Sequence, residues 1–275
     1  MSVFRRLSQT LQQHGTLTVL IVLNCTVFLL INIIGNLSHL DLLGFFGLPV
    51  GGSAFVSRFW TIFTYMFTHV NLAHIFWNMV LFYFSAQIFF TLFNERQLLY
   101  VYVMSGLCGA ALVLLLGLLM PASFSSSILI GASAAVLGVG AVMAVYSPDY
   151  MVYLFGILEM PYKYFYLLTF GLSTVIDLSV NTGGKISHVG GAAFGLVFGM
   201  ALKKGKDLSR AKLRLKKKPD LKVVSRHTDH HKETEARLSD EQRMNLLLDK
   251  ISRSGYDSLT RSEKDELYRL SQKKS

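Results

Sequence analysis

Long apolar stretches dominate the first 203 residues and predict membrane helices. A helix needs about 20 apolar residues to cross the hydrocarbon core of a bilayer. Six stretches approach or meet this length, and the fourth is the shortest and the richest in small residues. They cover residues 16–35, 72–93, 98–119, 131–147, 162–179 and 186–203. The pattern therefore predicts an all-α polytopic membrane protein, in which a six-helix transmembrane bundle is followed by a small soluble helical tail.

The polarity of the chain changes abruptly after residue 203. Residues 204–238 are basic and contain few apolar positions, which is typical of a linker. Residues 239–275 regain a helical pattern of apolar positions. The sequence therefore predicts three parts: a membrane domain over residues 1–203, a basic linker over 204–238, and a cytoplasmic helical hairpin over 239–275.

Two capping patterns define the predicted hairpin. Ser239 with Gln242, and Thr260 with Glu263, have the spacing of a capping box, in which each side chain bonds the backbone of the other residue. Gly255 lies between them and suits the end of the first helix. The apolar positions that should share the inner faces are Met244, Leu247, Leu248, Ile251, Leu267 and Leu270.

Composition and charge agree with a membrane body. The chain is 52% hydrophobic and only 16% charged, which is too apolar for an ordinary soluble domain of 275 residues. In membrane proteins, Lys and Arg are enriched in the segments that lie on the cytoplasmic side. Placing both termini inside leaves only Arg58 and Lys185 outside and keeps these basic positions inside: Arg5, Arg6, Arg96, Lys163, Lys203, Lys204 and Lys206.

Polar side chains at membrane depth are costly, so each one needs a reason. His69, His74 and Asn78 are such residues near the second predicted span. His74 and Asn78 are four residues apart and share one helix face, so both can donate hydrogen bonds to a common point. The alternative is a polar pair that joins neighbouring helices.

A nucleophile and a base also lie at predicted outer ends of spans. Ser133 begins the fourth span among small residues, and a helix N-terminus favours a developing negative charge. His188 begins the sixth span, before Gly191 and Gly195 at a spacing that allows close helix contact. A serine and a histidine in contact are the minimum for base-activated nucleophilic catalysis. The alternative for Ser133 is a small residue in a packing seam.

No acidic residue is evidently placed to orient the imidazole of His188. The nearest acid on the predicted outer side is Asp177, at the end of a different span, and we assign it no role.

Over about residues 10–203 the sequence resembles the rhomboid family of intramembrane serine proteases. The segment His69–Asn78 reads HVNLAHIFWN and is similar to the family's second-span signature of two histidines and an asparagine. The segment GAS at residues 131–133 matches its Gly-x-Ser motif. The segment HVGG at residues 188–191, with Gly195 beyond, matches its final-span motif.

The resemblance implies a role for each matching residue. Ser133 attacks the scissile carbonyl, and His188 takes its proton and later returns it to the leaving amine. His74 and Asn78 resemble side chains that bind the oxyanion together with the backbone N–H of Ser133. The supporting positions that the resemblance implies are Gly131, His69, Gly191 and Gly195.

These observations predict an endopeptidase that cleaves single-span membrane proteins in or near their transmembrane segment. No metal or organic cofactor is expected. Besides the substrates, the expected partner is the bilayer, with anionic lipid at the basic tail; no nucleic acid is expected. The family resemblance favours the inner membrane of a bacterial cell. The alternative is a catalytically silent rhomboid-like protein that binds membrane proteins, for example in quality control.

Overall fold

The computed structural model describes residues 12–50, 52–124, 127–154, 157–176, 182–210 and 240–272. The chain forms two compact units, Met1–Lys212 and Leu213–Ser275. Each unit is mainly helical.

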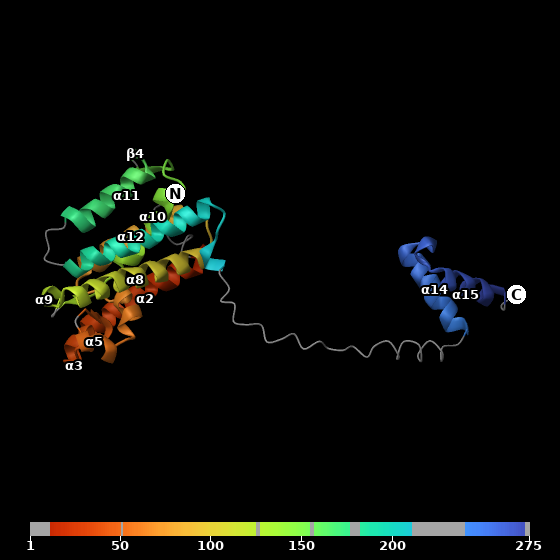
Figure 1. Ribbon diagram of the computed structural model, residues 1–275, viewed down its shortest axis with the longest axis horizontal. Helices are drawn as coiled ribbons and strands as arrows, with labels where there is room; N and C mark the ends of the chain where they lie inside the picture. The colour runs from red at the N-terminus through yellow and green to blue at the C-terminus, as the bar shows by residue number, and fades with distance from the viewer. Residues whose placement is uncertain are drawn as a thin grey trace. The chain divides into compact units, whose positions relative to one another are not determined.

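Long helices form the bundle of the first unit (Figure 1). They are α2 (Gly15–Leu29, continued by the π-helical η1, Leu30–Gly35), α7 (Leu72–Phe89), α8 (Glu95–Leu119), α10 (Ser133–Tyr146), α11 (Tyr162–Gly171, continued by the π-helical η3, Leu172–Ile176) and α12 (Thr182–Lys203). Figure 1 shows α11, α12 and α8 running alongside one another.

Among the described residues, four helices are long and apolar enough to cross a membrane: Gly15–Gly35, Leu72–Phe89, Glu95–Leu119 and Thr182–Lys203. They coincide with four of the six predicted spans, so the protein is a membrane protein. The predicted spans at 131–147 and 162–179 coincide with α10 and with α11 plus η3, which are shorter. The 14 residues of α10 reach about 21 Å, less than a hydrocarbon core of about 30 Å. That these two segments complete a six-span bundle stays a prediction.

Short elements connect the long helices. The first connection holds α3 (Asn36–Ser38), α4 (Leu42–Phe46), β1 (Leu48–Pro49), α5 (Gly52–Ser57), α6 (Thr61–Thr64) and the 3-10 turn η2 (Tyr65–Phe67). Between α8 and α10 lie α9 (Pro121–Phe124) and β2 (Ile128–Leu129), and β2 pairs antiparallel with β1. Between α10 and α11, β3 (Met151–Leu154) pairs antiparallel with β4 (Leu158–Pro161).

Three side chains hold the first connection together by bonding the end of α4. The last carbonyl groups of a helix have no partner within it and need donors from elsewhere. Arg58 Nη1, Trp60 Nε1 and Thr64 Oγ1 supply them at 2.6, 2.9 and 2.7 Å. Their acceptors are the carbonyl oxygens of three consecutive residues, Gly44, Phe45 and Phe46.

Glycines allow α12 to lie almost in backbone contact with α10. A Cβ atom added at Gly191 or Gly195 would overlap a carbonyl oxygen of α10, and one at Gly199 would lie 2.9 Å from another. The carbonyls belong to Ala134, Gly138 and Val142. The four-residue spacing of the glycines therefore places one face of α12 against α10, as small-residue seams do in membranes.

Another face of α12 lies close to α8. A Cβ atom at Gly190 would lie 2.7 Å from the carbonyl oxygen of Cys108, and one at Gly109 would lie 2.8 Å from that of Ser187. The helix that carries His188 is thus fixed between two neighbours, and small residues on both sides make this possible.

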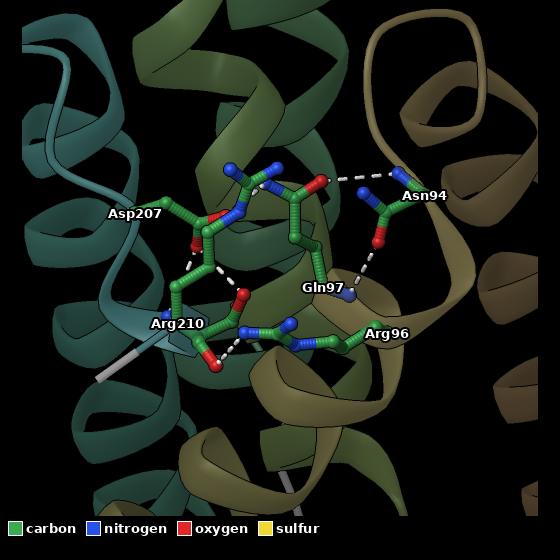
Figure 2. A network of polar contacts seen from close by, with 6 residues as sticks. Asn94, Arg96, Gln97, Asp207 and Arg210 are labelled. Atoms are coloured by element: carbon green, nitrogen blue, oxygen red, sulfur yellow. Dashed lines mark hydrogen bonds and ion pairs between the residues drawn. The ribbon is translucent and has the colours of Figure 1, made fainter. Parts of the chain in front are cut away.

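The segment that follows α12 is attached to the start of α8 by a polar network (Figure 2). Asn94 and Gln97 form a capping box at the beginning of α8. The Gln97 side chain also donates to Asp207 Oδ2 at 3.1 Å, and Arg96 donates to the carbonyl of Ser209 at 2.5 Å. Because the 3-10 turn η4 (Leu208–Arg210) takes part, the ordered contacts of the first unit continue beyond the predicted domain end at residue 203.

The second unit is a helical hairpin formed by α14 (Asp240–Ser254), the 3-10 turn η5 (Tyr256–Ser258) and α15 (Arg261–Gln272). Gly255 ends α14 with a φ of 80°, which glycine adopts without strain. The predicted capping box at the start of α15 is confirmed: the Thr260 N–H donates to Glu263 at 2.7 Å, and the Glu263 N–H donates to Thr260 Oγ1 at 3.3 Å. Ser239 of the other predicted box, and most of the predicted linker, lie outside the described residues.

The core of this hairpin is small. Leu247, Leu259 and Leu270 are buried, and Met244, Ile251 and Leu267 pack around them. The prediction that Leu248 shares the inner face was wrong, since 49% of it is exposed. One residue along a helix rotates the side chain by about 100°, and a single partner helix covers only a narrow stripe of α14.

Candidate active site

Ser133 and His188 are brought together by the glycine seam between α10 and α12. Ser133 Oγ lies 2.6 Å from His188 Nε2, although the two residues are 55 positions apart. Both side chains are half-buried. This is the hydrogen-bond distance over which an imidazole can take a hydroxyl proton.

The start of α10 presents backbone donors beside Ser133. Ser133 is the first residue of the helix, and its N-cap Ala132 makes no side-chain capping bond. The first internal helical bond is donated by Val136 to the carbonyl of Ala132 at 2.9 Å. The N–H groups of the first turn therefore have no acceptor within the helix and point toward its N-terminal end.

The imidazole of His74 packs against Gly131, two residues before the serine. Gly131 has a φ of 109°, and a Cβ atom there would lie 2.9 Å from His74 Nε2 and 3.8 Å from Ser133 Oγ. A side chain at position 131 would thus displace the imidazole from its place beside the serine. At the start of α7, Asn71 Oδ1 accepts from the His74 N–H at 2.7 Å, which fixes the helix end that carries the ring.

Asn78 lies one turn after His74 on α7 and is buried. Its amide nitrogen donates to the His74 carbonyl at 2.8 Å. An amide nitrogen carries two N–H groups, so this bond leaves a second one for another acceptor.

His69 packs next to the same region. His69 is fully buried, and its Nε2 accepts a hydrogen bond from the Ala132 N–H at 3.4 Å. Its ring meets the ring of His74 edge-on, with 4.9 Å between the centroids. The Asn32 amide donates to the His69 carbonyl at 3.3 Å. His69 therefore contacts both the turn before Ser133 and the neighbouring imidazole.

One contact of His188 was not predicted. Thr174 Oγ1, from the π-helical η3, lies 3.2 Å from His188 Nδ1. A single threonine in an apolar span gives no sequence signal, because threonine is common in membrane helices and bonds its own backbone there. Asp177, the acid to which no role was assigned, lies outside the described residues.

All eight predicted site residues thus lie in or next to one region of the bundle. Ser133 and His188 are in direct contact, His74 and His69 surround the turn before the serine, and Asn78 supports α7. Gly131 leaves room for an imidazole. Gly191 and Gly195 allow the approach of the two helices that carry the serine and the histidine.

Comparison with protein families agrees with this arrangement. The rhomboid domain matches residues 56–205, which is 150 of the 275 residues and includes every predicted site residue. A family of unknown function (DUF6576) matches residues 228–273, the region of the helical hairpin. No curated protein matches the chain at a significant level. By the extent of the domain match, this chain belongs to the rhomboid family.

Proposed function

We propose that this protein is an intramembrane serine endopeptidase that uses Ser133 as nucleophile and His188 as general base. Members of the rhomboid family are generally serine proteases of the membrane. The observation that carries the proposal for this chain is the 2.6 Å contact between Ser133 Oγ and His188 Nε2. A catalytically silent relative has no need for such a contact, and nothing else observed favours that alternative.

In the proposed reaction, Ser133 Oγ attacks the scissile carbonyl carbon while its proton moves to His188 Nε2. The resulting imidazolium then gives this proton to the leaving amine, and an acyl-enzyme ester remains on Ser133. A water molecule, deprotonated by the same nitrogen, hydrolyses the ester and restores the serine.

The tetrahedral intermediate carries a negative oxygen that needs donors. We assign this task to the Ser133 N–H and to the side chains of His74 and Asn78. The unpaired first turn of α10 and the closeness of the His74 ring to Ser133 support the assignment. Donors fixed in advance are worth more in a site with little water than in solution, because they need no reorganisation.

The expected substrates are single-span membrane proteins, cleaved in or next to their transmembrane segment. An intact helix engages its carbonyl groups in internal hydrogen bonds, so a cleavable segment has to unwind locally. Small or helix-weakening residues near the outer boundary of the substrate span favour that step. Because α10 is shorter than the hydrocarbon core is thick, we expect Ser133 at its start to lie below the membrane surface, within reach of such a segment.

We further propose that both termini are cytoplasmic and that the protein resides in the bacterial inner membrane. The distribution of Lys and Arg supports this orientation. The basic linker would then lie beside the inner leaflet, where each basic residue contributes about 1 kcal/mol of attraction to anionic lipid.

Incubation of the purified protein with a labelled single-span substrate tests the proposed function. Ser133→Ala and His188→Ala should each abolish cleavage while the protein stays inserted and folded, and the double variant should be no worse than either single one. Full cleavage by purified Ser133→Ala would refute the mechanism.

A further inference from the structure

His188 is held on both sides of its ring by hydroxyl groups from two different helices. Nε2 faces Ser133 Oγ at 2.6 Å, and Nδ1 faces Thr174 Oγ1 at 3.2 Å. Ser133 comes from α10, and Thr174 comes from η3 at the end of α11. Three separate elements therefore meet at one imidazole.

The direction of proton transfer determines what Nδ1 requires. For Nε2 to accept the serine proton, the neutral imidazole has to carry its own proton on Nδ1. This N–H needs an acceptor, because an unpaired buried donor is costly and a ring without such a bond is free to hold the wrong tautomer. We propose that Thr174 is the positioning residue that accepts this bond and orients His188 for catalysis; the proposal rests on the proposed function above.

The neighbouring hydroxyl gives Thr174 a partner of its own. Ser173 Oγ lies 3.4 Å from Thr174 Oγ1 and donates to the carbonyl of Phe170 at 3.2 Å. With each hydroxyl donating to the next acceptor, the bonds run from His188 Nδ1 through Thr174 and Ser173 to a backbone carbonyl. In this arrangement Thr174 Oγ1 donates its hydrogen to Ser173 Oγ and keeps a lone pair for the proton on His188 Nδ1.

Thr174 lies in the middle of the π-helical segment η3. A π turn holds one residue more than an α turn, so side chains within it are rotated relative to an uninterrupted α-helix. Thr174 is half-buried toward His188, whereas the next residue, Val175, is 74% exposed. Thr174, and not its neighbour Val175, is therefore the residue of η3 whose side chain reaches the imidazole.

A neutral hydroxyl suits a site at membrane depth better than a carboxylate does. An ionised acid in a membrane has a large desolvation cost unless it is paired. Threonine supplies an acceptor without that cost, and its β-branched side chain has few rotamers, which favours a fixed oxygen position. During acylation the Ser133 proton moves to Nε2 while the Nδ1 proton stays bonded to Thr174, so Thr174 neither gains nor loses a proton.

The test compares purified full-length variants in one detergent, with a labelled single-span substrate and with a fluorophosphonate that labels Ser133 in a single step. Thr174→Val keeps the shape of the side chain and removes the acceptor, and it should lower kcat and the labelling rate about 5- to 100-fold with KM within about twofold. Thr174→Ser should restore most of the activity. Thr169→Val, which removes a hydroxyl that bonds only its own helix at Tyr166, is the matched control and should behave like the parent protein.

Three results would overturn the inference. They are an unchanged rate in Thr174→Val, an equal loss in Thr174→Val and Thr174→Ser with lowered thermal stability in both, or an equal loss in the Thr169→Val control.

Ser173→Ala gives a second test that leaves Thr174 in place, and it should show a smaller loss than Thr174→Val, since it removes only the next bond of the chain. Cleavage by Ser133→Ala would instead refute the proposed function, so the two failures are distinguishable.

Discussion

In the membrane body, α12 meets α10 through backbone atoms, whereas in the C-terminal unit α14 meets α15 through long side chains. A Cβ atom at Gly195 would overlap the Gly138 carbonyl, so nothing larger than hydrogen fits there. The hairpin instead buries Leu247, Leu259 and Leu270, and ion pairs join its helices, among them Lys250 with Glu263 at 2.6 Å and Arg243 with Glu266 at 3.2 Å.

The difference follows from what surrounds each unit. Lipid chains are as apolar as leucine, so helices in a bilayer gain little from burying large side chains and associate through close packing. The hairpin, which the sequence predicts to be soluble, should gain most of its stability by removing apolar area from water, and a unit of this size has little to remove. The body should therefore be sensitive to added atoms, and the hairpin to lost atoms and lost charges.

The largest expected effect on cleavage is that of one methyl group in the seam. Gly191→Ala and Gly195→Ala should each separate α12 from α10, cost about 1–3 kcal/mol or more through overpacking, and abolish cleavage because Ser133 and His188 no longer meet. Thermal unfolding in detergent and cleavage of a single-span substrate measure both effects.

Gly183→Ala is the control on the same helix. A Cβ atom at Gly183 meets nothing closer than the Val113 side chain at 3.8 Å, which is an ordinary contact. If the three variants were equally stable and active, close backbone packing would not be what holds the body together.

The next largest effect concerns the proposed oxyanion site. His74→Ala and Asn78→Ala should each lower kcat about 100- to 1,000-fold while KM changes little, since one donor to the oxyanion is lost. Steady-state kinetics check this, with His39→Ala as an exposed control from the first connection. Unchanged kcat in both variants would leave the pair with a helix-joining role alone.

Removing atoms from the hairpin should have the converse effect. Leu270→Ala should cost about 2–5 kcal/mol, which is enough to unfold so small a core, while cleavage in detergent stays at the parent level. Hydrogen exchange of α14 and α15 in the full-length protein reports unfolding, and Leu248→Ala, at an exposed position, is the control.

A chain ended after Lys212, at the boundary between the two units, should cleave like the full-length protein as well. A folded truncated protein without activity would show that the hairpin belongs to the catalytic unit.

The smallest expected effect is a pH dependence confined to the hairpin. The side-chain bond from Lys250, followed by the bonds from Thr260, lowers the pKa of Glu263 from 4.5 to about 2. Because the pKa is lower in the folded state, this carboxylate stabilises the hairpin above about pH 4.5, and the contribution is lost as the pH falls toward 2. Hydrogen exchange measures this loss: the protection factors of the α15 amides should fall between pH 6 and pH 2.5.

Glu263→Gln is the control for the titration. It should be less stable than the parent at pH 6 and should lose less stability on acidification, since one titrating group is gone. Equal pH dependence in both proteins would show that Glu263 is not the source of the effect.

The sequence by itself determined much of this protein. Apolar runs located the helices, and the four-residue spacing of glycines after His188 identified the face of α12 that packs closely. The types and spacing of His74, Asn78, Ser133 and His188 suggested the chemistry. These features are local, because helical periodicity converts spacing along the chain directly into position on a helix face.

Other features depended on tertiary structure. The contact of Thr174 with His188 joins the π-helical η3 to α12, and no local sequence pattern indicates a π turn. The fit of the His74 ring against Gly131, and the bonds of Arg58, Trp60 and Thr64 to the end of α4, likewise join segments that only the packed chain brings together. Such contacts depend on the register and rotation of one helix against another, which the close packing of many small residues fixes collectively and which no single motif encodes.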